Sequence, residues 1–288
     1  MKTGILLIGH GTRDPAGTRE FFQLAEHLRG IAINHQFVVQ PALLEFQQPD
    51  IAGGWRRLLD QQIDRVVVAP LLLFLAGHAK HDIPQEVAEV AGTMPFVFSR
   101  PLSRHADLVE LVCDRIREGM AAGCESGNKN AAPGDAANTP QHDDTMVVVI
   151  GRGNRDVCAH ADLRVLTKLV GHRLQQRHAI AGCTYAFYAM ATPDVPTVLD
   201  DVAAQARRRG LRRVFVHPHL LFNGRLYAAI QRLVDEAQRR NDDIVFTLGD
   251  YLGPVLPVAS AIWGRCVAAC DSFEAAIMTE ASGANAMR

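Results

Sequence analysis

Two histidines and one glutamate carry the most reactive chemistry of this sequence. His10 lies between two glycines, and His78 follows a glycine. Glu45 lies between the two histidines along the chain. Two imidazoles can hold a borderline divalent ion such as Co2+, Fe2+, Ni2+ or Zn2+, and a nearby carboxylate can complete the ligand set or accept a proton. The adjacent glycines let a ligand approach the backbone closely. These residue types therefore predict a site that holds a divalent metal ion and moves protons.

The same motifs occur a second time without these three side chains. Residues 5–14, with the sequence ILLIGHGTRD, return as residues 147–156, with the sequence VVVIGRGNRD. Two further motifs recur in the same order at nearly the same spacing, which indicates tandem duplication of a unit of roughly 120 residues. We expect the site in the first copy, which alone keeps the reactive side chains. The positions of His10, Glu45 and His78 are occupied in the second copy by Arg152, Ala189 and Arg225.

Short apolar runs that alternate with helical patterns must position these residues. Residues 5–8 form a continuous apolar run, which is typical of a strand buried on both faces. The alternation predicts a parallel four-stranded sheet with helices on both faces, and reactive groups at the carboxyl ends of its strands. His10, Glu45 and His78 all fall at such ends. Further strands are predicted at residues 37–46, 65–74 and 96–99, and helices at residues 19–29, 49–61, 81–91 and 105–121.

The duplication predicts an α/β protein of two tandem domains. We expect a first, catalytic domain at residues 1–122 and a second, degenerate domain at residues 146–278. Residues 123–145 contain no large apolar side chain and predict a flexible linker. Residues 279–288 are mostly small and are expected to fray.

Bulk composition narrows the classes of partner and compartment. The formal net charge of -1 argues against a nucleic-acid-binding protein, which usually carries a basic excess. The sequence has neither a run of about 18 apolar residues nor a signal-like start, so we expect a cytoplasmic protein without a membrane partner. Its six cysteines form no Cys-x-x-Cys pair, which favours reduced thiols and no structural zinc.

At three motifs the sequence resembles the class II sirohydrochlorin chelatases, a family of cobalt and iron chelatases. The resemblance rests on residues 7–13, on residues 44–45 and above all on residues 70–84, with the sequence PLLLFLAGHAKHDIP. It covers the first copy and, through the repeat, the second, as in the long two-domain members. It implies flavodoxin-like chelatase domains that insert a divalent metal into sirohydrochlorin without ATP, with no cofactor beyond the substrate metal. Co2+ for cobalamin synthesis is the favoured metal, and Fe2+ for sirohaem and Ni2+ stay open.

The resemblance also implies roles for individual residues. His10 and His78 match the family's metal-binding histidines, one of which would also accept pyrrole protons, and Glu45 matches its acidic residue, which would orient or relay. The carboxylates of sirohydrochlorin are expected to meet cations and the N–H groups of a helix N-terminus. Two other histidines, His217 and His219, align inside a strand and are expected in the core or at its rim. Residues expected to bind the substrate are Gly11, Thr12, Arg13, Lys80, Arg152, Arg155 and Arg225.

Other functions fit the residues less well. A histidine phosphatase would need an arginine where Gly9 stands, and dinucleotide binding would need a third glycine where Asp14 stands. The alternative that the protein is a carrier, which binds metal or tetrapyrrole without inserting the metal, stays open.

The duplication also bears on the oligomeric state. A duplicated unit can supply its own partner, so we expect a monomer that is internally a pseudo-dimer.

Overall fold

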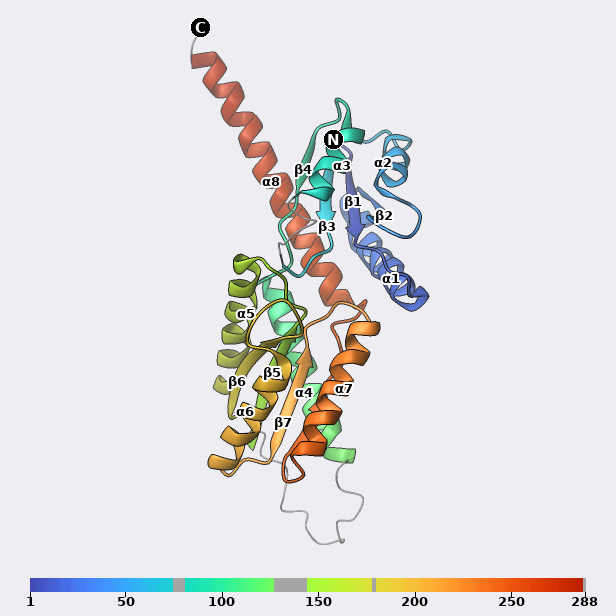
Figure 1. Cartoon of the computed structure of the whole chain (residues 1–288). Coiled ribbons are helices and arrows are strands. Elements are labelled where there is room, and N and C mark those ends of the chain that lie inside the picture. Colours follow the sequence, from blue (N-terminus) through green and yellow to red (C-terminus); the bar gives the residue numbers. More distant parts are fainter. Residues whose placement is uncertain (75–80, 127–143, 178–179, 287–288) are drawn as a thin grey trace. The chain divides into compact units, whose positions relative to one another are not determined.

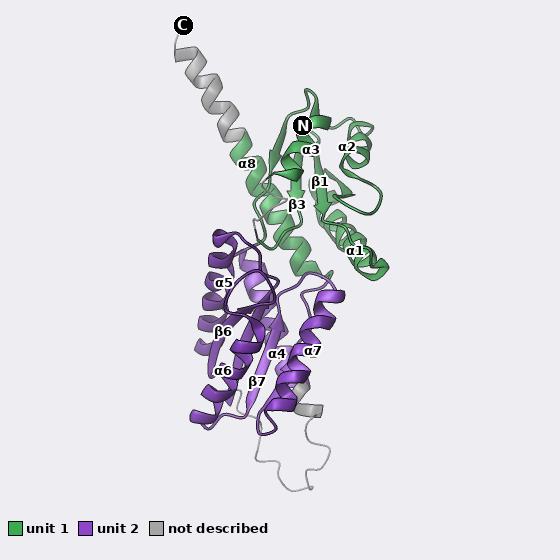
Figure 2. Cartoon of the chain, viewed as in Figure 1, with its two compact units in different colours: residues 1–102, 254–288 green, residues 103–253 purple. Residues whose placement is uncertain are grey.

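The computed structural model describes residues 1–74, 81–126, 144–177 and 180–286 (Figure 1). The chain forms two compact units (Figure 2). Unit 1 comprises residues 1–102 and 254–288, and unit 2 comprises residues 103–253. Among the described residues, no helix is long and apolar enough to cross a membrane.

Unit 1 is built on a parallel sheet with the strand order β2-β1-β3-β4. Its central strand β1 is buried along its whole length, as the apolar run predicts. Helices α2 and α3 pack against one face of the sheet through Trp55, Ile83 and Val87. The elements are β1 (Thr3–Gly9), α1 (Pro15–Ala32), η1 (Ile33–His35), β2 (Phe37–Leu43), α2 (Ile51–Leu59), β3 (Arg65–Pro70), α3 (Asp82–Ala91), β4 (Phe96–Phe98) and α8 (Leu256–Ala286).

Unit 2 repeats this plan with the parallel strand order β6-β5-β7-β8. The matching strand orders confirm the predicted fold class and the duplication. The elements are α4 (Ala106–Ser126), β5 (Thr145–Gly151), α5 (Val157–Gln176), β6 (Gly182–Phe187), α6 (Val195–Arg208), β7 (Arg213–Pro218), α7 (Arg225–Arg240) and β8 (Val245–Leu248).

Several boundaries differ from the sequence prediction. Strand β2 ends at Leu43 and β3 at Pro70, both earlier than predicted. After β3 the chain turns, because the amide of Leu72 donates to the carbonyl of Pro70. Helix α4 continues to Ser126, into the predicted linker, and α8 continues to Ala286, through most of the predicted tail. Residues 127–143 of the predicted linker lie outside the described part.

The compact units also differ from the predicted division at residues 1–122 and 146–278, because the last helix of each copy packs on the sheet of the other copy. Helix α4 follows β4 in sequence but contacts α5, β7 and β8, whereas α8 contacts α1, β3 and β4. Figure 2 shows α4 in the colour of unit 2 and α8 in the colour of unit 1. The two terminal helices are therefore exchanged between the copies.

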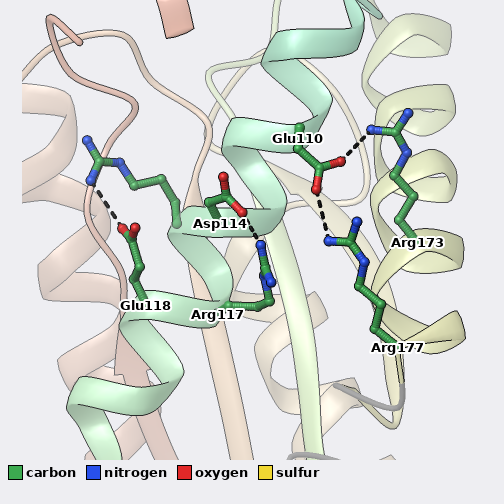
Figure 3. Close-up of polar contacts among 7 residues, drawn as sticks. Glu110, Asp114, Arg117, Glu118, Arg173 and Arg177 are labelled. Carbon is green, nitrogen blue, oxygen red and sulfur yellow. Dashed lines mark hydrogen bonds and ion pairs between the residues drawn. The ribbon is translucent and has the colours of Figure 1, made fainter. Parts of the chain in front are cut away.

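Shape complementarity holds α4 in unit 2. The ring of Phe215 on β7 fills a notch at Gly119 of α4, where an added Cβ would lie 2.5 Å from the ring. Glu110 of α4 also pairs with Arg173 and Arg177 of α5, at 3.0 and 2.9 Å (Figure 3). These ion pairs are partly exposed and each stabilise by about 1 kcal/mol or less. The apolar contact therefore supplies most of the attachment.

Candidate active site

The loops that follow β1 and β2 are joined by backbone hydrogen bonds at the carboxyl edge of the sheet in unit 1. The amide of Leu44 donates to the carbonyl of Gly9 at 2.9 Å, and the amide of Glu45 donates to the carbonyl of His10 at 3.1 Å. His10 and Glu45 are both half-buried. The structure thus brings these two predicted site residues together at the predicted edge.

Gly11 is what permits this close approach. Its φ of +89° lies in the left-handed region. A Cβ at this position would lie 2.1 Å from the carbonyl oxygen of Glu45, well inside van der Waals contact. The glycine predicted to lie against substrate therefore also has a structural function, which is to seat one loop on the other.

Replacing Gly11 by alanine is expected to separate the two loops. The backbone clash and the left-handed φ together should lower the free energy of unfolding by about 2–4 kcal/mol. Urea denaturation measures this loss. Gly153→Ala is the matched control in unit 2, where φ is +81° and a Cβ would lie 1.8 Å from the carbonyl oxygen of Ala189. Unchanged stability in both variants would contradict the account of these glycines.

The start of α1 arranges the next predicted residues. The side chain of Asp14 caps the helix by accepting from the amide of Ala16 at 2.9 Å, and the hydroxyl of Thr12 accepts from the amide of Asp14 at 3.1 Å. Arg13 is exposed, and its guanidinium carbon lies 5.0 Å from the centre of the Phe46 ring. Phe46 is not among the site residues predicted from the sequence, although its position between Glu45 and Gln47 sets this aromatic residue apart from its polar neighbours.

The segment that follows β3, where His78 is predicted to lie, falls partly outside the described residues. The amide of Leu71 donates to the carbonyl of Ile8 at 2.8 Å, so the chain after β3 begins beside β1. His78 and Lys80 fall within residues 75–80, outside the described residues, and their roles stay predictions. His81, which directly precedes α3, is exposed. Within the described ranges, no three His, Cys, Asp or Glu side chains form a cluster that could hold a metal ion.

Unit 2 keeps the backbone of this edge and changes its side chains. The amide of Tyr188 donates to the carbonyl of Gly151 at 2.9 Å, and the amide of Ala189 donates to the carbonyl of Arg152 at 3.0 Å. Arg152, Arg155 and Arg225 are exposed. The two copies therefore share one backbone arrangement, and only the first places an imidazole and a carboxylate on it.

Two histidines lie in the core of unit 2, as predicted from their alignment with the first copy. His217 belongs to β7, and His219 directly follows this strand. His217 and His219 are 0% and 1% exposed. Neither ring nitrogen of His217 has a hydrogen-bond partner among the described residues. Burial lowers the pKa of His217 well below its usual value, helped by His219 and by the charge of Arg115. Burial also lowers the pKa of His219 to about 3.

These histidines are expected to make the protein sensitive to acid. The unfolded chain binds protons on them below about pH 6.5 while the folded chain does not, so stability carries no protonation penalty above that pH and falls as the pH drops below it. The slope approaches about 1.4 kcal/mol per pH unit for each histidine. Urea unfolding at pH 7 and pH 5 measures the loss. The variant with His217→Ala and His219→Leu carries the residues found at the aligned positions 69 and 71 of the first copy. Its stability should depend less steeply on pH, and an unchanged pH dependence would contradict the role given to these histidines.

Fold and site together define a duplicated α/β protein that holds a histidine and a glutamate at the sheet edge of one copy. The protein-family model CbiX matches residues 4–119 and 146–268. The chain therefore belongs to the CbiX family, and the resemblance to the sirohydrochlorin chelatases is confirmed.

Similar proteins span both copies. The sirohydrochlorin cobaltochelatase of Priestia megaterium is 28% identical over 253 residues, which cover 86% of this chain and 74% of that protein. The sirohydrochlorin ferrochelatase of the same organism is 29% identical over 253 residues, covering 86% and 84%. The solved structure of SirB from Bacillus subtilis with Fe3+ has a TM-score of 0.73 at 26% identity and covers 95% of this chain and 98% of that one.

Proposed function

We propose that this chain inserts a divalent metal ion into sirohydrochlorin without ATP, and that the reaction takes place in unit 1. The observation that carries the proposal is the joined pair of loops that presents His10 and Glu45, together with Arg152 and Ala189 at the same backbone positions of unit 2. Similarity to chelatases that span both copies supports the substrate.

Insertion requires three operations from the protein. It must present a partly dehydrated ion, accept the two protons that leave the pyrrole nitrogens, and hold the macrocycle so that its nitrogens reach the metal. We assign ion binding and proton acceptance to the imidazoles of His10 and His78, whose ordinary pKa lies near neutrality. Glu45 would orient an imidazole or relay a proton.

The carboxylates of sirohydrochlorin need cationic partners. Arg13 is exposed beside the first turn of α1, where backbone N–H groups also favour anions. We assign further carboxylate contacts to Gly11, Thr12 and Lys80 of the first copy. The second copy would contribute Arg152, Arg155 and Arg225, because arginine suits bidentate contact with carboxylates. A KM for sirohydrochlorin that is unchanged in the variant with Arg152→Ala and Arg225→Ala would remove the second copy from substrate binding.

Co2+ is proposed as the preferred metal, because the long two-domain form resembles the chelatases of cobalamin synthesis. The names of the relatives divide between cobalt and iron, and the same ligands accept Co2+, Fe2+ and Ni2+. Initial rates of insertion, followed by absorbance with each metal, decide the preference. We further propose that the protein acts in the cytoplasm as a monomer.

Steady turnover separates an enzyme from a carrier. With sirohydrochlorin and Co2+ in large excess, a chelatase continues for many equivalents of product per chain, whereas a carrier stops after one. We expect many equivalents, and a single one would overturn the proposed function.

A further inference from the structure

Phe46 combines three properties that bear on the proposed site. It is 53% exposed although it is apolar, its φ is +71°, and it directly follows Glu45 on the loop that is bonded to His10. A bulky residue in the left-handed region is unfavourable, and glycine would adopt the same backbone without cost. The side chain is thus held in place against the preference of its own backbone.

The partner of the ring indicates what it can bind. The guanidinium of Arg13 lies over the ring of Phe46 with its carbon 5.0 Å from the ring centre, within the range of a cation–π contact. The pair therefore offers an apolar aromatic surface and a positive charge side by side. A flat conjugated molecule with carboxylates at its periphery complements both, because the ring stacks and the guanidinium pairs with an anion.

The second copy supplies an internal comparison. Met190 aligns with Phe46, has a φ of +60° and is also 53% exposed. Arg155 aligns with Arg13, so the second copy keeps the cation and lacks the aromatic ring. The aromatic residue thus occurs together with the imidazole and the carboxylate of the first copy.

We propose that Phe46 is a substrate-positioning residue on which the flat face of sirohydrochlorin stacks, with Arg13 holding a peripheral carboxylate. This inference rests on the proposed function and extends it to the orientation of the macrocycle. Stacking removes the exposed ring from water and places the macrocycle beside the residue that precedes Phe46, which is Glu45. Phe46 would thereby favour one orientation of the pyrrole nitrogens toward the site.

The Phe46→Gly variant tests the stacking without endangering the fold. Glycine accepts the left-handed φ, so the melting temperature should stay unchanged or rise. The Kd for metal-free sirohydrochlorin, measured by fluorescence titration of the full chain, should rise about 10-fold. Met190→Gly is the matched control, which should give the same change in melting temperature and an unchanged Kd.

Two further variants separate aromatic stacking from simple apolar contact. Phe46→Tyr should keep the Kd of the unaltered chain, whereas Phe46→Leu should raise it nearly as much as glycine does. An unchanged Kd in both Phe46→Gly and Phe46→Leu would overturn the proposal and leave the proposed function standing. A change in oligomeric state with an unchanged Kd would likewise overturn it, since the ring would then contact a second copy of the chain. Failure of the unaltered chain to bind sirohydrochlorin would instead overturn the proposed function itself.

Discussion

Replacing His10 by alanine is expected to lower the rate of metal insertion into sirohydrochlorin by about 100-fold or more, the scale of a lost proton acceptor or metal ligand. The free energy of unfolding should change far less than the rate does, because the backbone carbonyl of His10, which joins the two loops, is kept in the variant. The measurement is the initial rate followed by absorbance, paired with urea denaturation. The same loss of rate is expected for His78→Ala.

Arg152→Ala provides the matched control, since Arg152 occupies the position of His10 on an equivalent backbone. It should raise the KM for sirohydrochlorin and leave kcat near its original value. A His10→Ala variant that kept more than about a tenth of the original rate would remove the imidazole from the reaction.

Ending the chain after Gly253 is expected to unfold unit 1 and leave unit 2 folded. This truncation removes α8, which contacts α1, β3 and β4. Helix α8 contributes buried apolar side chains to unit 1. The centre of its Trp263 ring also lies 4.8 Å from the centre of the His35 ring and 4.9 Å from the centre of the Phe37 ring. Among the buried side chains of α8, Val258 and Ile262 are each worth about 1.5–3 kcal/mol. Together with the smaller buried alanine and cysteine side chains, their loss is comparable with a domain's whole stability of about 5–15 kcal/mol.

Hydrogen exchange measured by mass spectrometry distinguishes the units. Amides of β1 and β3 should lose protection in the truncated chain, while those of β5 and β7 keep it. A chain that ends after Phe273 keeps the first part of α8 and serves as the control, with protection expected in both units. Retained protection of β1 in the shorter chain would show that residues 1–122 are self-contained, as the sequence-based division assumes.

Local sequence patterns were sufficient to predict the two sheets and the sheet edge at which His10 and Glu45 lie. A strand buried on both faces needs a continuous apolar run, and residues 5–8 and 147–150 show one in each copy. The carboxyl ends of parallel strands meet at one edge, so the predicted strands alone place His10 and Glu45 near each other. Comparison of equivalent positions in the two copies then pointed to the first copy as the one with the reactive side chains, because Arg152 and Ala189 stand where His10 and Glu45 would be in the second.

Only the tertiary structure decided which partner each of these elements packs against. The apolar face of α4 is visible in the sequence, yet nothing local tells whether it covers the sheet before it or the sheet after it. That choice depends on fits between residues far apart in the chain, such as Phe215 against Gly119. The second function of Gly11 and the exposure of Phe46 likewise arise where two loops meet in space. Periodicity records the type of an element and its buried face, whereas complementarity between distant surfaces exists only after the chain has folded.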